Sequence, residues 1–69
     1  MPVIQITMVK GRPDELVKRC IKGIAKTVHE TLGVPLDSVR VIACEVPATN
    51  WAAGAVTKDE QRAKESAPQ

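Results

Sequence analysis

The sequence predicts an α/β (α+β) fold built on one βαβ unit, in which a helix connects two parallel strands. Three observations support this prediction. A segment over residues 3–9 is rich in β-branched residues, a helical pattern follows over residues 13–32, and a second β-rich segment covers residues 39–46. Parallel strands need a crossover of this length, which is usually a helix, and such crossovers are right-handed.

The first strand is predicted over residues 3–9, which read Val-Ile-Gln-Ile-Thr-Met-Val. Neither face of this segment is strongly polar, and that pattern suits a strand buried on both sides. Gly11 and Arg12 follow it and form a turn toward the helix.

The helix is predicted to begin at Pro13 and to end near Leu32. Proline is favoured at the first helical position, and two acidic residues directly after it suit the positive end of the helix dipole. Gly33 is a natural residue after the last turn, and Pro35 prevents continuation. Apolar residues recur at four-residue spacing on one broad face: Leu16, Cys20, Ile24, Val28 and Leu32.

Three lysines, Lys18, Lys22 and Lys26, line the other side of this helix. Such a row could bind anions. Charge on the outer face of a helix is, however, the normal pattern of a solvated surface. We therefore interpret the lysine row as solvent-facing.

The C-terminal third of the chain contains less regular structure. After the second strand, residues 47–50 read as a loop and residues 51–56 as a short hairpin or edge strand. From Thr57 onward the sequence turns polar. We expect one domain over residues 1–57 and a polar, flexible tail over residues 58–69.

Chain length and composition predict self-association. The chain has 69 residues, no Phe or Tyr and one Trp, so its core must be aliphatic. A chain of this size buries only about 60% of its unfolded surface. A two-stranded sheet under one helix also leaves strand edges and one sheet face uncovered. We expect two copies to form a four-stranded sheet with two helices on one face.

Charge and cysteine content argue against several classes of partner. The net charge is only +2 and no aromatic residues interleave with the basic ones, so we expect no nucleic-acid partner. No apolar run is long enough to span a membrane and the N-terminus lacks signal-peptide features, so we expect a cytoplasmic protein. Cys20 and Cys44 have no metal-like spacing and His29 is the single histidine, so no metal site is expected.

Pro2 is the most informative residue for function. It follows Met1, and an initiator methionine is usually removed before a small residue. The mature chain would then begin with a free secondary amine, whereas a proline inside a chain has no N–H. Such an amine at the end of a buried strand is a candidate general base or nucleophile. The simpler interpretation is that proline is common after Met1 and that termini are loose.

Three further residues accompany Pro2. Arg12 lies at the strand-to-helix turn, Arg40 near the start of the second strand, and Trp51 is the lone aromatic residue. Each also has a purely structural interpretation. Arg12 could be a turn residue, Arg40 could belong to an ion pair at the sheet edge, and Trp51 could be a core residue.

Together, these features resemble the 4-oxalocrotonate tautomerase family over roughly residues 2–57. The matching elements, besides Pro2 after Met1, are Val3-Ile4-Gln5-Ile6, Gly11-Arg12-Pro13-Asp14-Glu15, Leu36-Asp37-Ser38-Val39-Arg40-Val41-Ile42, and Glu45-Val46-Pro47 leading to Asn50-Trp51.

The resemblance implies a tautomerase-like fold and a role for each residue. Pro2 is the general base and Arg12 binds a substrate carboxylate. Arg40 binds the hydroxyl or oxo end and stabilises charge that develops on oxygen, and Trp51 walls the site. Elementary chemistry agrees, because apolar walls and two guanidinium groups disfavour a protonated amine and lower its pKa. Arginine also suits bidentate binding of a carboxylate.

The expected activity is the cofactor-independent conversion of an unsaturated 2-hydroxy dicarboxylate, such as 2-hydroxymuconate, to its 2-oxo tautomer. Such a step belongs to the bacterial degradation of aromatic rings. The family's active forms are usually homohexamers, trimers of dimers, with sites shared between subunits. The expected partners are therefore a small dicarboxylate substrate and further copies of the chain.

Two alternatives remain beside this activity. One is a dehalogenase, hydratase or decarboxylase on the same scaffold, and the other is a non-catalytic chain of a hetero-oligomer. Val9 stands where related dehalogenases carry an additional arginine, and no acidic residue near Trp51 serves to activate water; both points argue against hydrolytic dehalogenation. The family's glycine-rich hairpin appears here with the single glycine Gly54, so the site rim is expected to differ.

Overall fold

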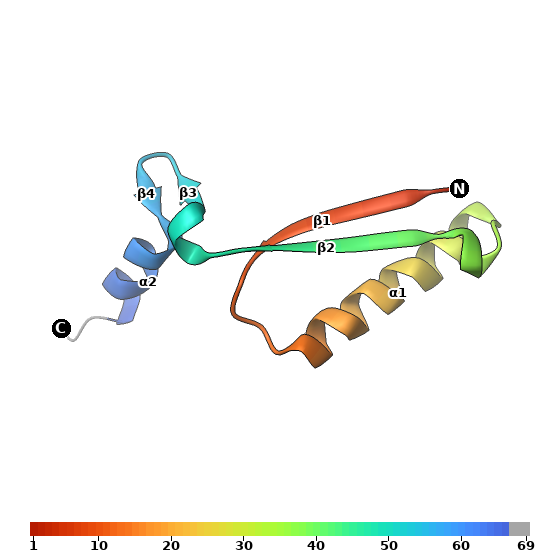
Figure 1. Ribbon diagram of the computed structural model, residues 1–69, viewed down its shortest axis with the longest axis horizontal. Coiled ribbons are helices and arrows are strands. Elements are labelled where there is room, and N and C mark those ends of the chain that lie inside the picture. Colours follow the sequence, from red (N-terminus) through yellow and green to blue (C-terminus); the bar gives the residue numbers. More distant parts are fainter. Residues whose placement is uncertain (67–69) are drawn as a thin grey trace.

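The computed structural model describes residues 1–66 and contains the predicted βαβ unit (Figure 1). Its elements, in chain order, are β1 (Val3–Val9), α1 (Asp14–Leu32), a 3₁₀ turn (Leu36–Ser38), β2 (Arg40–Val46), a 3₁₀ turn (Ala48–Asn50), β3 (Ala52–Ala53), β4 (Val56–Thr57) and α2 (Lys58–Ser66). β1 and β2 pair in parallel, as expected, and α1 connects them.

Helix α1 begins one residue later than predicted and ends at the predicted place. Pro13 has an extended ψ of 143° and therefore caps the helix instead of forming its first residue. Its carbonyl oxygen accepts a hydrogen bond of 3.0 Å from the Leu16 amide. Gly33 adopts the left-handed conformation at φ 72°, and its amide donates to the His29 carbonyl oxygen. Glycine carries no Cβ and reaches this conformation without steric cost.

The β1–β2 sheet has one half-covered face and one open face. On β1, Ile4, Ile6 and Met8 are half-buried, whereas the residues between them are exposed. β2 alternates in the same way from Arg40 to Cys44. The single chain therefore covers one side of the sheet only, and burial of β1 on both sides requires something beyond one chain.

The chain has little core of its own. The hydrophobic residues that it buries among residues 1–66 are Val9 and Val39, at 9% and 8% exposure. Its radius of gyration is 16.0 Å, whereas a compact domain of this length has about 11 Å. Its accessible surface is 5321 Å², against roughly 4,200 Å² for a compact monomer of this mass. A shape this open is typical of a subunit that folds against other subunits.

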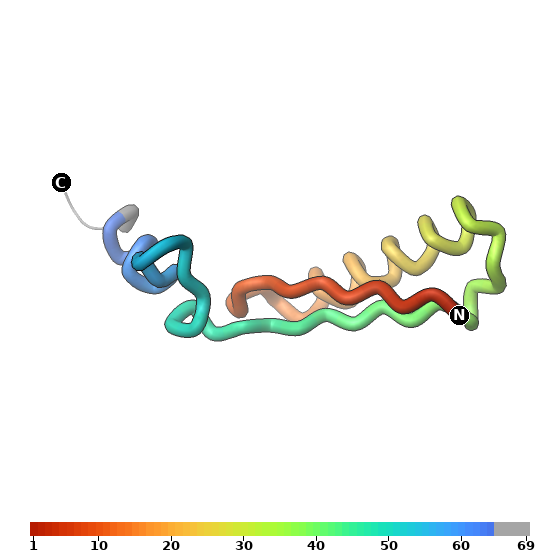
Figure 2. The backbone as a smooth tube through the Cα atoms, turned by 90° about the horizontal axis from the view of Figure 1, so that it is seen from above, coloured from red at the N-terminus to blue at the C-terminus, as the bar shows by residue number. Residues whose placement is uncertain are grey.

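The C-terminal region lies beyond the end of β2, away from the body of α1 (Figures 1 and 2). β3 and β4 form an antiparallel hairpin, one of the two forms expected for residues 51–56, with Gly54 at φ 64° in the tight turn. No helix among residues 1–66 is long and apolar enough to cross a membrane.

The expected flexible tail is the main departure from the sequence prediction, because residues Lys58–Ser66 form helix α2. The Thr57 amide donates a hydrogen bond of 3.0 Å to Glu60 Oε1 at the start of this helix. This bond is half of a capping box, which satisfies a backbone amide at the helix N-terminus. Helix α2 packs against the 3₁₀ turn Ala48–Asn50. Residues 67–69, also part of the expected tail, lie outside the described residues.

Candidate active site

The four site residues predicted from the sequence lie in two pairs at opposite ends of the β1–β2 sheet. Pro2 precedes β1 and Arg40 begins β2, where the Arg40 amide donates a 3.0 Å hydrogen bond to the Pro2 carbonyl oxygen. Arg12 follows the far end of β1, and Trp51 follows β2 at that same end. The seven residues of β1 separate the two pairs by roughly 20 Å.

At the Pro2 end, backbone oxygens orient the Arg40 guanidinium. Its Nη1 donates a 2.6 Å hydrogen bond to the carbonyl oxygen of Asp37 and a longer one to that of Val39. A carbonyl group accepts a hydrogen bond without neutralising the charge, and a guanidinium carries five N–H donors in all. Arg40 is exposed, so it can present this positive charge to an anion.

Pro2 itself is half-buried at the start of β1, and Met1 before it is 83% exposed. With Met1 attached, the Pro2 nitrogen belongs to a peptide bond and is not basic. Removal of the exposed Met1 would convert it into a secondary amine at the end of the sheet.

The opposite end of the sheet carries a groove of about 310 Å³, which we call the cationic groove. Its walls are Thr7, Met8, Val9, Arg12, Trp51, Lys58 and Arg62. The side chain of Arg12 is anchored there by a 3.1 Å hydrogen bond from Nη1 to the Val9 carbonyl oxygen. The carbonyl oxygen of Trp51 accepts a 2.7 Å hydrogen bond from the Lys58 amide, which ties the aromatic residue to α2.

Three of the groove's residues are cations and none is an acid. A cavity lined by one sign of charge concentrates counter-ions, so this end of the sheet is suited to bind an anion. Lys58 and Arg62 were not anticipated as site residues, because their segment was expected to be a flexible tail. Their four-residue spacing after the Thr57–Glu60 capping pair is the signal in the sequence that could have identified them.

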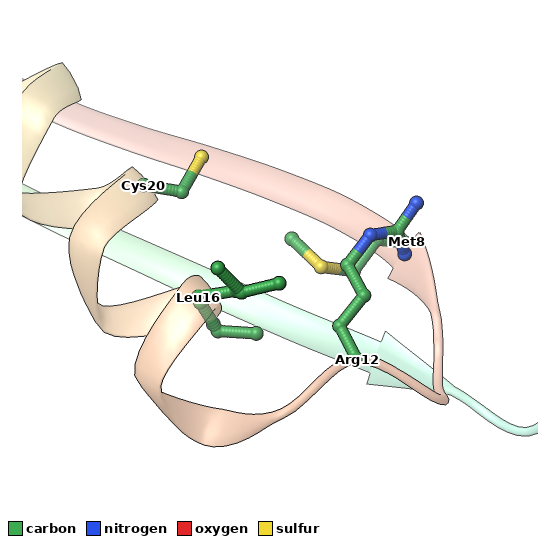
Figure 3. A pocket seen from close by; sticks show the side chains of 5 residues that line it. Met8, Arg12, Leu16 and Cys20 are labelled. Carbon is green, nitrogen blue, oxygen red and sulfur yellow. The ribbon is translucent and has the colours of Figure 1, made fainter.

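A second pocket of about 390 Å³ lies between β1 and the first turns of α1 (Figure 3). Met8 reaches from β1 toward Leu16 and Cys20 on α1, and Arg12 lies beside Met8. Val17 completes the lining, which is mostly apolar. Arg12 therefore borders both cavities.

One other sequence interpretation, the solvent-facing lysine row, can be compared with the structure. Lys18, Lys22 and Lys26 are all exposed, as a solvent-facing row requires. Among residues 1–64, whose side chains the structure describes, no group of three or more His, Cys, Asp or Glu side chains is placed to hold a metal ion.

The geometry places a candidate base at one end of a chain and an anion-binding groove at the other. A diacid of six carbons is far shorter than β1, so one chain cannot offer both ends of such a molecule to Pro2 and to the groove at once. If such a diacid is the substrate, a site that uses both pairs of residues needs at least two chains.

Comparison with known proteins identifies the family of the chain. A family model described as "Tautomerase enzyme" matches residues 1–54, a range that contains all four predicted site residues. A 2-hydroxymuconate tautomerase of Pseudomonas putida is 37% identical over 60 residues, which cover 87% of this chain and 95% of that protein.

Solved structures share the fold. TomN, a 4-oxalocrotonate tautomerase homologue in the tomaymycin biosynthetic pathway, has a TM-score of 0.87 at 37% identity, covering 94% of this chain and 100% of that one. A heterohexamer 4-oxalocrotonate tautomerase from Chloroflexus aurantiacus has a TM-score of 0.81 at 33% identity, covering 87% of this chain and 97% of that one.

Proposed function

The chain belongs to the 4-oxalocrotonate tautomerase family and is a tautomerase-type isomerase, and we propose that it converts an unsaturated 2-hydroxy dicarboxylate such as 2-hydroxymuconate to the 2-oxo tautomer. The observation that carries this proposal is the division of the site residues between the two ends of β1. One end supplies a candidate base and the other supplies binding for a remote carboxylate. We expect the reaction in the cytoplasm, as a step in the degradation of aromatic rings.

We further propose that two chains pair through the outer edges of their β1 strands. Within the described residues, β1 pairs only with β2, so its other edge is available for a strand. Two-fold symmetry makes such a pairing antiparallel. The start of one β1 then lies beside the end of the other, and Pro2 of one copy meets Arg12 and Trp51 of the second copy.

In the proposed reaction, the Pro2 amine removes the proton from the 2-hydroxyl group of the dienol. Arg40 stabilises the negative charge that develops on this oxygen, which becomes the carbonyl oxygen of the product. Electrons shift along the conjugated chain, and the protonated Pro2 returns a proton to a carbon farther along it. Arg12 holds the remote carboxylate and Trp51 keeps water from that wall of the site.

The open face of the sheet supports assembly beyond the dimer. Val3 and Ile42 lie on this face and are 61% and 51% exposed. Apolar surface of this kind favours burial against another dimer. We propose a homohexamer, a trimer of dimers; the hexameric relative from Chloroflexus aurantiacus supports that number.

The same relative is a heterohexamer. A second candidate function is therefore that of a non-catalytic chain that assembles with a different partner chain. The presence of Pro2, Arg12 and Arg40 in one chain favours the homohexamer, because identical copies then supply every group of the proposed site.

The test begins with the intact mass of the purified protein, which should lack Met1, and with light scattering, which should give six chains. A spectrophotometric assay with 2-hydroxymuconate should then show loss of the dienol. A particle of one chain at micromolar concentration would refute the proposed assembly. The proposed activity would be refuted if the protein without Met1 converted the dienol no faster than buffer alone.

A further inference from the structure

The exposed surface of α1 has a charged side and an uncharged side. Lys18, Lys22 and Lys26 recur on the charged side at four-residue spacing. The other side, which we call the uncharged flank, consists of exposed residues that follow one another at spacings of three or four and therefore share a helix face: Leu16, Cys20, Gly23, Thr27 and Thr31. Depletion of charge is typical of the centre of a protein interface, whereas charge is typical of a solvated helix face.

The uncharged flank lies on the side of α1 that faces β1. The helix packs more against β2 than against β1 (Figure 1). Leu16 and Cys20 point toward β1, where they line the pocket of about 390 Å³ together with Met8 (Figure 3). Leu16 is nevertheless 47% exposed, and Cys20 is exposed. One chain therefore leaves the space above β1 open, between the uncharged flank and the outer edge of the strand.

The outer edge of β1 indicates what covers this space. Within residues 1–66, β1 pairs only with β2, and the proposed dimer adds the β1 of a second copy to the other edge. An antiparallel pair of strands has its two-fold axis perpendicular to the sheet, so both α1 helices lie on the same face and run antiparallel. Because each uncharged flank faces its own β1, the two flanks then face each other.

Gly23 is the central residue of α1 and lies within the uncharged flank. Glycine destabilises the interior of a helix relative to alanine. A Cβ built on Gly23 would have nothing within 4 Å, so packing inside one chain does not require a glycine there. Close approach of a second backbone is a use of glycine that fits this position.

The spacing of the elements also places Gly23 near the two-fold axis. Ile6 is the central residue of β1, two residues before Met8, which is a rise of about 6.6 Å along the strand. The same rise corresponds to about four residues of a helix. From Leu16 and Cys20, which lie opposite Met8, this step leads to residues 20–24. Gly23 therefore lies level with the middle of β1, where a two-fold axis would pass.

We propose that the uncharged flank of α1 binds the same flank of a second copy, and that the two helices approach most closely at Gly23. Leu16 and Cys20 of one helix then lie against Thr27 and Thr31 of the other. This contact closes the pocket that Arg12 borders, so it connects assembly to the anion-binding end of the sheet. The inference rests on the β1 pairing in the proposed function and adds a second contact to it.

The first test compares Gly23→Leu with Lys22→Leu. Both place one leucine on the exposed surface of α1, on the uncharged flank and on the charged side respectively. Leucine is a better helix former than glycine and meets no neighbour at position 23 of a single chain. Against a second helix, however, the added side chain overpacks the contact. Light scattering on dilution should show the concentration of half-dissociation raised about tenfold or more in Gly23→Leu. Lys22→Leu should keep the wild-type value.

The second test uses the native thiol of Cys20 and leaves the flank unchanged. In a Cys44→Ser protein, Cys20 is the only thiol. It is exposed in one chain, so only a second copy can protect it from a thiol reagent. In the native assembly it should react with iodoacetamide about tenfold or more slowly than in urea. The control adds Lys22→Cys to a protein with Cys20→Ser and Cys44→Ser, and its thiol should react as fast as in urea.

An assembled protein in which Cys20 reacts as fast as in urea would overturn the helix contact, as would a folded Gly23→Leu protein that dissociates like the wild type. Neither result would affect the proposed β1 pairing or activity. Circular dichroism shows whether Gly23→Leu folds, and the thiol measurement decides if it does not. A protected Cys20 in an assembly that does not convert the dienol would support the helix contact and contradict the proposed activity.

Discussion

The two ends of the β1–β2 sheet offer a substrate different chemistry. At the Pro2 end, a half-buried proline lies beside Arg40, whose guanidinium bonds to backbone oxygens. At the Arg12 end, a groove of about 310 Å³ holds three cations and the only tryptophan. In the proposed function, one chain separates proton transfer from anion binding by the length of a strand. Under the proposed function, activity depends on assembly, and we expect that each end can be impaired without the other.

Blocking the Pro2 nitrogen should have the largest effect, because it removes the proposed base from the Pro2 end and leaves the groove intact. A variant that retains a residue before Pro2 should lose about 10²- to 10⁴-fold in kcat. Binding of adipate, a saturated six-carbon diacid that cannot react, should be unchanged in calorimetry. Light scattering is the control for assembly; a blocked hexamer that still turned over at the normal rate would eliminate Pro2 as the base.

Arg40→Ala should affect the same end less severely. In the proposed reaction the guanidinium faces the oxygen on which charge grows in the transition state, so its loss should lower kcat and raise KM together. The combined loss in kcat/KM should exceed tenfold, as expected for a charge-assisted pair worth about 1.5–3 kcal/mol. Arg19→Ala, which removes an exposed arginine from α1, is the matched control. Wild-type kcat in Arg40→Ala would remove this residue from the chemistry.

Arg12→Ala should change the other end alone. Loss of a contact that ground state and transition state share raises KM and leaves kcat nearly constant. We expect KM for the dicarboxylate to rise about tenfold or more. The contrast with Arg40→Ala, measured in the same assay, sharpens the distinction between the two ends. A drop in kcat that matched Arg40→Ala would show that the distinction is wrong.

Glu60→Ala should have the smallest effect. It removes the carboxylate that accepts the Thr57 amide at the start of α2, and such caps contribute about 0.5–2 kcal/mol. Urea denaturation at a fixed protein concentration should show a loss in the free energy of unfolding near the lower limit of this range, because Glu60 is exposed. Lys64→Ala on the same helix is the control. A fall in kcat in a Glu60→Ala protein that remains folded would mean that α2 supports the Pro2 end as well.

The elements with local signals could be predicted from the sequence. The β-branched run of β1, the hairpin around Gly54 and the end of α1 at Gly33 all have such signals, and the structure confirms them. Pro13 lies one position outside the predicted helix because its extended ψ makes it a cap. Helix α2 was missed because its polar composition, typical of a tail, obscured the capping pair Thr57 and Glu60.

The site could be predicted only as a set of residues. Pro2, Arg12, Arg40 and Trp51 were named from a family resemblance, and their roles stay predictions. Their separation into two pairs follows from the length of β1 and from its parallel pairing with β2. No single sequence motif carries that information. Lys58 and Arg62 enter the groove only once α2 is folded, so missing the helix also meant missing two residues that line the groove.

The most direct test of a site divided between copies is complementation. One chain carries a blocked Pro2 and an intact Arg12, and the other carries Arg12→Ala and an intact Pro2; each alone should be impaired. The two chains are refolded together at equal ratio. Random assembly should then place an intact Pro2 beside an intact Arg12 in roughly one quarter of the sites. Activity should therefore recover to about that fraction of the wild-type rate at low substrate concentration. Mixed oligomers, verified by mass spectrometry, that showed no recovery over the separate variants would contradict a site built from two chains.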